Sequence, residues 1–159
     1  MSSASASKEL IEELAPLEVR DTDYGKTGSH VDVTVEPDKV RRSAELLNAR
    51  GYFLEDLTAI DRVDHREVVY RFNQHIETHR ITIRAGLGSE DEVDTISDIF
   101  AAANWQEREC HEFLGVKFKG HPDLRRLLLP EDADFFPLRK DFKVPPEILA
   151  PEYHQEKND

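Results

Sequence analysis

The last part of this chain limits most strongly what the sequence can fold into. From His121 to the final residue there are six prolines and no glycine. Proline fixes the backbone angle φ and removes an N–H donor, so neither a long helix nor a central strand can run through this stretch. The stretch is nevertheless rich in large apolar side chains, namely Leu124, Leu127, Leu128, Leu129, Phe135, Phe136, Leu138 and Phe142. Such a segment cannot cover its own apolar surface, and exposed apolar surface of this extent usually marks a partner interface.

Length and composition place the chain among ordinary globular proteins. A chain of 159 residues predicts one domain with a real core. Hydrophobic residues make up 38% and charged residues 34%, and no apolar stretch approaches the roughly 20 residues of a membrane helix. The single cysteine, Cys110, excludes an internal disulfide and an iron–sulfur cluster held by cysteines of this chain alone.

The charge of the chain is unevenly distributed. A net charge of −12 argues against nonspecific nucleic-acid binding. Residues 117–143, however, contain seven Lys and Arg against five Asp and Glu. This stretch is the least acidic part of the chain, which favours docking on an acidic or mixed-charge partner.

The apolar pattern before this stretch predicts an α+β domain. We expect a sheet of about four strands, covered on one face by helices, with a long extended C-terminal tail. The predicted helices are 8–15, 37–50, a helix that begins at a Ser89/Glu92 capping box, and 105–114, and the predicted strands are 30–35, 52–60, 67–72 and 79–83. In domain terms, we expect a disordered tail over 1–7, a globular domain over 8–116 and an extended docking segment over 117–159.

A charged run lies in the helix predicted over 105–114. Arg108 and Glu112 stand four residues apart, and Glu109 and Glu112 three apart, so they are neighbours on one helix face. This face, with Glu107, either holds the basic tail or a partner, or is a solvated surface of small energetic effect. Spacing alone favours the solvated surface.

Two further blocks follow in the proline-rich stretch. In the first, Gly120 allows a tight turn, Pro122 extends the residue before it, and two adjacent arginines offer planar donors for carboxylates. In the second, apolar anchors flank charged side chains, as in the energetic centres of interfaces. The first block comprises Gly120, His121, Pro122, Asp123, Leu124, Arg125 and Arg126, and the second comprises Pro137, Leu138, Arg139, Lys140, Asp141 and Phe142.

Catalytic and metal-binding alternatives have weak support. Cys110 and His111 are adjacent, and adjacent helical residues point about 100° apart, so they make a poor ligand pair. A small enzyme that uses His121 or Cys110 stays open, but no nucleophile, paired acid or phosphate-binding loop accompanies them. We predict a structural cysteine and no metal site.

These blocks together resemble one known family. Glu107-Arg108-Glu109, Gly115 and the two blocks at 120–126 and 137–142 are similar to the signature of the 30-kilodalton subunit of proton-pumping NADH:quinone oxidoreductase (respiratory complex I). Related subunits occur in membrane-bound nickel-iron hydrogenases and F420-type dehydrogenases. Glu112 departs from the aspartate usual in that family, and Asp134-Phe135-Phe136 stands where a tryptophan is usual.

The resemblance implies a non-catalytic scaffold subunit of the peripheral arm, on the cytoplasmic side of the inner membrane. It implies no cofactor in this chain, and iron–sulfur clusters, FMN and quinone in the parent complex. Its partners would be the hydrogenase-like large subunit and the iron–sulfur subunits, with membrane contact only through the complex. The interface residues that it implies are Glu107, Arg108, Glu109, Glu112, His121, Pro122, Asp123, Leu124, Arg125, Arg126, Pro137, Leu138, Arg139, Lys140, Asp141 and Phe142.

Overall fold

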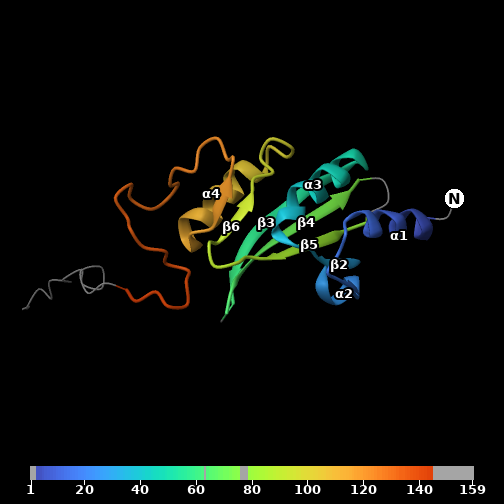
Figure 1. Ribbon diagram of the computed structural model, residues 1–159, viewed down its shortest axis with the longest axis horizontal. Coiled ribbons are helices and arrows are strands. Elements are labelled where there is room, and N and C mark those ends of the chain that lie inside the picture. Colours follow the sequence, from blue (N-terminus) through green and yellow to red (C-terminus); the bar gives the residue numbers. More distant parts are fainter. Residues whose placement is uncertain (1–2, 63, 76–78, 145–159) are drawn as a thin grey trace, which may run out of the picture.

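A mixed five-stranded sheet forms the centre of the molecule (Figure 1). The computed structural model describes residues 3–62, 64–75 and 79–144. The strands lie in the order β1-β2-β5-β4-β3, with bounds β1 Glu18–Asp21, β2 Val31–Thr34, β3 Tyr52–Asp61, β4 Arg66–Gln74 and β5 Ile81–Gly86. The predicted α+β class is confirmed. The sheet has one strand more than the four predicted. This strand, β1, was not predicted because it is exposed on both faces and shows no apolar alternation.

The sheet pairs strands that lie far apart in the sequence. β2 runs parallel to β5, with Val33 opposite Ile83, and the other neighbours are antiparallel. The predicted hairpin of the strands over 67–72 and 79–83 is confirmed, because β4 and β5 pair with Tyr70 opposite Ile83. Residues 76–78, in the predicted connection, lie outside the described residues.

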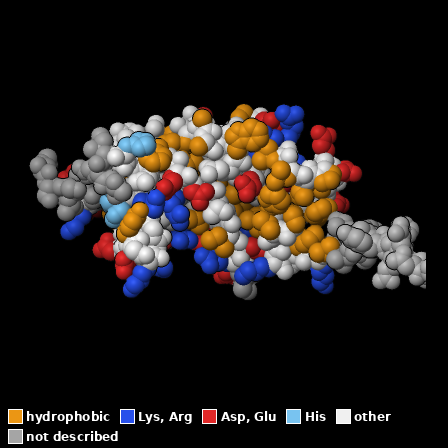
Figure 2. Space-filling model, turned by 180° about the vertical axis from the view of Figure 1, so that it is seen from behind, with side chains coloured by type: hydrophobic (Ala, Val, Ile, Leu, Met, Phe, Trp, Pro, Cys, Tyr) orange, Lys and Arg blue, Asp and Glu red, His pale blue; other side chains and the backbone are white. Residues whose placement is uncertain are grey.

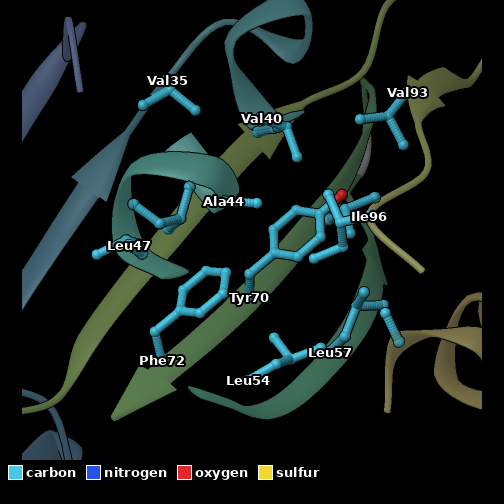
Figure 3. Close-up of a cluster of buried hydrophobic side chains, with 14 of the residues drawn as sticks. Val35, Val40, Ala44, Leu47, Leu54, Leu57, Tyr70, Phe72, Val93 and Ile96 are labelled. Carbon is cyan, nitrogen blue, oxygen red and sulfur yellow. The ribbon is translucent and has the colours of Figure 1, made fainter. Parts of the chain in front are cut away.

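Helices cover one face of the sheet, as predicted. They are α1 (Ser3–Glu13), the short η1 (Pro37–Lys39), α3 (Val40–Ala49) and α4 (Ala103–Leu114). Alternate strand residues such as Tyr70 and Phe72 point toward these helices and pack with Ala44 and Leu47 of α3 (Figure 3). α1 begins at Ser3, within the stretch predicted as a disordered tail, and residues 1 and 2 lie outside the described residues.

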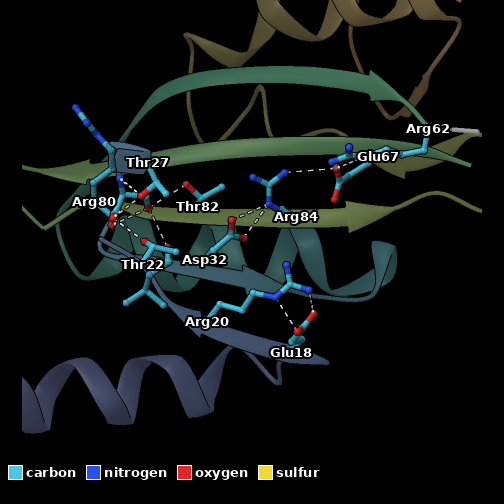
Figure 4. A network of polar contacts seen from close by, with 12 residues as sticks. Glu18, Arg20, Thr22, Thr27, Asp32, Arg62, Glu67, Arg80, Thr82 and Arg84 are labelled. Carbon is cyan, nitrogen blue, oxygen red and sulfur yellow. Dashed lines mark hydrogen bonds and ion pairs between the residues drawn. The ribbon is translucent and has the colours of Figure 1, made fainter. Parts of the chain in front are cut away.

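The opposite face of the sheet is polar. The Nε atom of Arg84 lies 2.8 Å from the carboxylate of Asp32, and Glu67 accepts hydrogen bonds from Arg62, at 2.8 Å, and from Arg84, at 3.4 Å (Figure 4). Such partly exposed pairs each contribute about 0–1 kcal/mol. At one end of this face, the four-residue helix α2 (Tyr24–Thr27) lies beside the start of β2. The polar alternation explains why the sheet needs helices on one face only.

The helix predicted from the Ser89/Glu92 capping box is wrong. The chain there forms β6 (Glu92–Asp94) and turns, and β6 pairs in parallel with β7 (Lys117–Lys119). Asp91 has a φ of 53°, which is incompatible with a first helical turn. The apolar residues that suggested a helical stripe are all buried, namely Val93, Ile96, Phe100 and Ala103. Val93 lies in β6, Ile96 and Phe100 lie in the turns that follow, and Ala103 begins α4, so their helix-like spacing reflects burial against the core. The strand partner that defines β6 lies far along the chain.

Candidate functional site

Residues 120–144 fold back along α4 (Figure 1). We refer to them as the return segment. They contain neither helix nor strand, as the prolines predict. Their backbone groups are bound by side chains of α4, so the charged helix face and the two proline-rich blocks form one structure. The alternative that the whole helix face is a solvated surface is wrong.

Glu112 is the main anchor of the return segment. Its carboxylate accepts hydrogen bonds from the backbone N–H groups of Leu127, Leu128 and Leu129 at 3.1, 3.0 and 2.5 Å. The side chain is fully buried, and this burial opposes ionisation. The three amides and nearby Arg126 outweigh that opposition and hold the pKa of Glu112 below its ordinary value. An ionised carboxylate therefore fixes three consecutive residues of the return segment.

Arg108 binds the same segment one turn earlier on α4. Its Nε atom donates to the carbonyl oxygen of Arg125 at 2.9 Å, and one Nη atom donates to that of Arg126 at 3.3 Å. Its guanidinium also lies 5.0 Å from the ring centre of Trp105. Arg108 is therefore held between the tryptophan and the return segment.

Glu107 lies on the inner side of α4 and is also fully buried. Its carboxylate accepts a hydrogen bond from the backbone N–H of Ile96 at 2.8 Å and contacts the hydroxyl of Thr95. Burial raises the pKa of Glu107 to about 7, although both contacts favour the ionised form. Glu107 thus ties α4 to the turn after β6.

His121 closes this arrangement from the return segment. Its Nε2 atom donates to the carbonyl oxygen of Asn104 at 3.1 Å, and the backbone N–H of Asp123 donates to Nδ1 at 3.0 Å. The side chain is fully buried, 3.9 Å from the Glu107 carboxylate. Both ring nitrogens are engaged, so His121 shapes the turn that presents Arg125.

The two arginine–carboxylate bonds from Arg125, each 2.8 Å, hold the pKa of Asp123 well below its usual range.

The second block is fixed at the C-terminal end of α4. The backbone N–H of Leu138 donates to the carbonyl oxygen of Phe113 at 3.2 Å, and Arg139 Nε donates to that of Leu114 at 2.7 Å. The guanidinium of Arg139 lies 4.1 Å from the ring centre of Phe136. One residue further on, the backbone N–H of Lys140 donates to Asp61 of β3 at 2.7 Å. Both blocks of the return segment are therefore tied to the folded part of the chain.

An apolar surface remains at this end of the molecule. Trp105, Leu128 and Leu138 are exposed by 63%, 78% and 62%, and a gathering of large exposed apolar residues often marks an interaction site. Figure 2 shows hydrophobic side chains gathered at the α4 end of the molecule, seen from behind. Trp105 and Leu128 were not among the predicted interface residues. The only tryptophan of the chain, beside the charged run, was the sequence signal that could have indicated this surface.

The predicted interface residues divide by exposure. Glu107 and Glu112 are buried and bind groups of this chain, so any interface role for them is indirect. The exposed members are Glu109, Pro122, Arg125, Leu138, Lys140 and Asp141, and the half-buried members are Arg108, Asp123, Leu124, Arg126, Pro137, Arg139 and Phe142. His121 has a fully buried side chain, and only its backbone is partly exposed. The structure thus brings together all three predicted blocks around α4.

Neither metal-binding nor thiol chemistry finds support in this geometry. Among the described residues, no group of three or more His, Cys, Asp or Glu side chains is placed to hold a metal ion. Cys110 is buried, and this burial raises the pKa of its thiol to about 12. None of the helices in the described part of the chain is both long and apolar enough to cross a membrane.

Comparison with solved structures shows a shared fold. A chain from the membrane-bound sulfane sulfur reductase, an archaeal respiratory membrane complex, superposes with a TM-score of 0.78 at 20% identity, covering 98% of this chain and 94% of that one. The trypsin-resistant fragment (1–134) of Nqo5 superposes with a TM-score of 0.64 at 22% identity, covering 76% of this chain and 98% of the fragment. At these identities the similarity concerns the fold alone.

Sequence comparison identifies the family. A family model described as respiratory-chain NADH dehydrogenase, 30 Kd subunit, matches residues 33–147. The C subunit of NADH-quinone oxidoreductase from Rhodobacter capsulatus is 42% identical over 69% of this chain, which spans 59% of that relative's length. The equivalent protein of Jannaschia sp. (strain CCS1) is 38% identical over 87% of this chain and 72% of the relative. This chain therefore belongs to the family of the 30 Kd subunit of respiratory-chain NADH dehydrogenase, also called the C subunit of NADH-quinone oxidoreductase.

Proposed function

We propose that this chain is a non-catalytic scaffold subunit in the peripheral arm of an NADH:quinone oxidoreductase. In this role α4 and the return segment dock on the hydrogenase-like large subunit. The iron–sulfur subunits are further partners, and the clusters, FMN and quinone belong to other chains. The complex would place this chain on the cytoplasmic side of the inner membrane, as a peripheral subunit that supports proton-coupled electron transfer.

The observation that carries this proposal is how the return segment is held. Glu112, Arg108 and Arg139 all bind backbone groups, so they fix the course of the segment and leave several of its side chains pointing outward. Leu138, Lys140 and the turn at Pro122 are exposed as a result. A surface ordered before binding loses less conformational entropy on association, which favours stable contact between subunits.

The related membrane complexes are the second candidate. The fold shared with a chain of the archaeal sulfane sulfur reductase complex supports a common scaffold role in several respiratory assemblies. The similarity in sequence to NADH-quinone oxidoreductase subunits favours the first candidate over a hydrogenase or an F420-type dehydrogenase. The composition of the purified assembly distinguishes these enzymes.

The two residues that a free-standing small enzyme would use, His121 and Cys110, both have buried side chains. His121 has both ring nitrogens in hydrogen bonds and a fully buried side chain. Cys110 is buried, with a pKa raised to about 12, so its thiol is not a nucleophile at neutral pH. A catalytic acid or base has to reach its substrate, and neither group does so in this structure.

The proposal is tested by purifying the tagged chain from gently solubilised native membranes and identifying the co-purifying subunits by mass spectrometry. Leu138→Asp is the interface variant, and Leu17→Asp is its control, because the two leucines are exposed by 62% and 60%. We expect Leu138→Asp to lose the other subunits while Leu17→Asp retains them. Recovery of the wild-type chain alone, or equal recovery of the complex by both variants, would contradict the proposed function.

A further inference from the structure

An open hollow lies between α4 and the return segment, on one side of Trp105. Its volume is about 310 Å³, and it is lined by Trp105, Gln106, Glu109, Leu127 and Leu128. We refer to it as the α4 hollow. Trp105 and Leu128 are largely exposed there, so the hollow offers apolar walls to an incoming side chain. Arg108, Arg125 and Arg126 line a separate hollow that shares only Trp105 with this one.

Two acceptor groups among the residues that line the α4 hollow have no donor among the described residues. The carboxylate of Glu109 is exposed and forms no ion pair or hydrogen bond within the described part of the chain. The Oε1 atom of Gln106 is buried and has no hydrogen-bond partner among the same residues. The Gln106 amide nitrogen donates weakly to Asp56, at 3.4 Å. Because the Gln106 oxygen is buried within the chain, the acceptor that a partner can reach in the α4 hollow is the carboxylate of Glu109.

Apolar walls beside a free carboxylate favour one class of side chain. Lysine and arginine have apolar stems that lie along such walls and cationic ends that donate several hydrogen bonds. A leucine or phenylalanine would cover the walls but leave the carboxylate of Glu109 without a partner. An acidic side chain would meet the carboxylate of Glu109 and be repelled.

We propose that the α4 hollow receives an arginine or lysine side chain of a neighbouring subunit, with Glu109 as its ion-pair partner. This inference rests on the proposed function and specifies the contact by which the docking surface recognises its neighbour. The exposed tryptophan and leucine beside Glu109 exclude water from the pair, which strengthens it.

The first test compares Glu109→Lys with Glu12→Lys. Both carboxylates are exposed, and the two variants change the net charge equally, but Glu12 lies on α1 at the far end of the molecule (Figure 1). Recovery of the other subunits with the tagged chain is measured at matched salt. We expect Glu109→Lys to lower recovery about tenfold or more and Glu12→Lys to leave it unchanged. Circular dichroism of each purified variant shows that the chain remains folded.

The second test locates the partner residue. A photoreactive phenylalanine analogue at Leu128, in the otherwise wild-type complex, is cross-linked and the joined peptide is identified. We expect an arginine or lysine near the cross-link, and we expect its replacement by glutamate to restore the recovery lost in Glu109→Lys.

The outcomes separate this inference from the proposed function. If Leu138→Asp loses the complex but Glu109→Lys retains it, the scaffold function stands and the cation-binding role of the α4 hollow is overturned. If no basic residue of a neighbour lies near the cross-link, that role is also overturned. If the wild-type chain recovers no other subunit, both proposals fail.

Discussion

The guanidinium of Arg139 lies against Gly115, in the space that a side chain on Gly115 would occupy. Gly115 ends α4 with a φ of 78°, and its N–H donates to the carbonyl oxygen of His111 at 2.9 Å. The same turn leaves the carbonyl oxygen of Leu114 free to accept from Arg139 at 2.7 Å. The glycine therefore terminates the helix and also makes room for the arginine that fixes the second block.

Gly115→Ala tests this double role. The left-handed backbone costs a residue with a Cβ atom about 1–3 kcal/mol, and the methyl group also displaces Arg139. Gly51→Ala is the matched control, because Gly51 has the same φ of 78° but its nearest contact would be the Gln74 amide at 3.9 Å. We expect both variants to lose stability in urea unfolding, with the larger loss in Gly115→Ala. Equal losses would mean that Arg139 adjusts without effect.

Glu112→Ala removes the anchor of the return segment. Three backbone N–H groups then lose their charged acceptor, and we expect a loss of about 3 kcal/mol in the free energy of unfolding. Hydrogen exchange by NMR should show the amides of Leu127, Leu128 and Leu129 losing protection. Glu109→Ala serves as the control, since this exposed carboxylate binds none of these amides. Retained protection in Glu112→Ala would contradict the anchoring role.

The Glu112 anchor also predicts a dependence on pH. Its folded-state pKa is lowered, so its stabilising effect is fully present above the ordinary carboxyl pKa of 4.5 and is lost as the pH falls through the lowered value. Acid titration of the Leu128 amide by NMR should follow this loss, and the transition should be absent in Glu112→Ala.

Glu107→Gln tests the opposite case. The folded-state pKa of Glu107 is about 7 against an ordinary 4.5, so its protonated form stabilises the fold and this contribution is lost as the pH rises between these values. Over this pH range the free energy of unfolding falls by about 3 kcal/mol. Glutamine keeps a neutral acceptor, so urea unfolding of Glu107→Gln should lack this decline between pH 5 and about 7. An unchanged pH slope would show that Glu107 is ionised in the folded chain.

Cys110 should be inert in the folded protein. Burial raises the pKa of its thiol to about 12, and the thiolate is the reactive form. We expect a thiol reagent at pH 8 to modify Cys110 at least about a hundredfold more slowly than in the urea-unfolded chain. Comparable rates in both states would contradict the buried position.

The sequence predicted the long, regular elements and missed those that depend on distant partners. Val31, Val33 and Val35 alternate clearly, and all three are buried in the core, the first two on one face of β2 and Val35 directly after it. β6 and β7 are three residues each, and they exist only because Glu92 and Lys117 are brought side by side. No local pattern carries that information. The spacing of Ser89 and Glu92 therefore predicted a helix where the chain forms a strand.

The candidate site was predicted in its residues but not in its arrangement. The spacing of Arg108, Glu109 and Glu112 indicated one charged helix face, yet it could not distinguish solvent from the chain's own backbone as the partner. Glu112 accepts hydrogen bonds from three amides that are 15 to 17 residues away, and Glu107 accepts one from the turn after β6. Such contacts form only after tertiary folding, and the exposed positions of Trp105 and Leu128 depend on them.

The position of β5 determines the order in which the sheet can be completed during translation. β5 lies between β2 and β4, although it is the last of the five strands to be synthesised. A nascent chain that ends before Ile81 holds two separate strand pairs, each with an unpaired edge open to aggregation. The N-terminal half of the domain therefore remains incomplete until residues 81–86 leave the ribosome and join the two pairs.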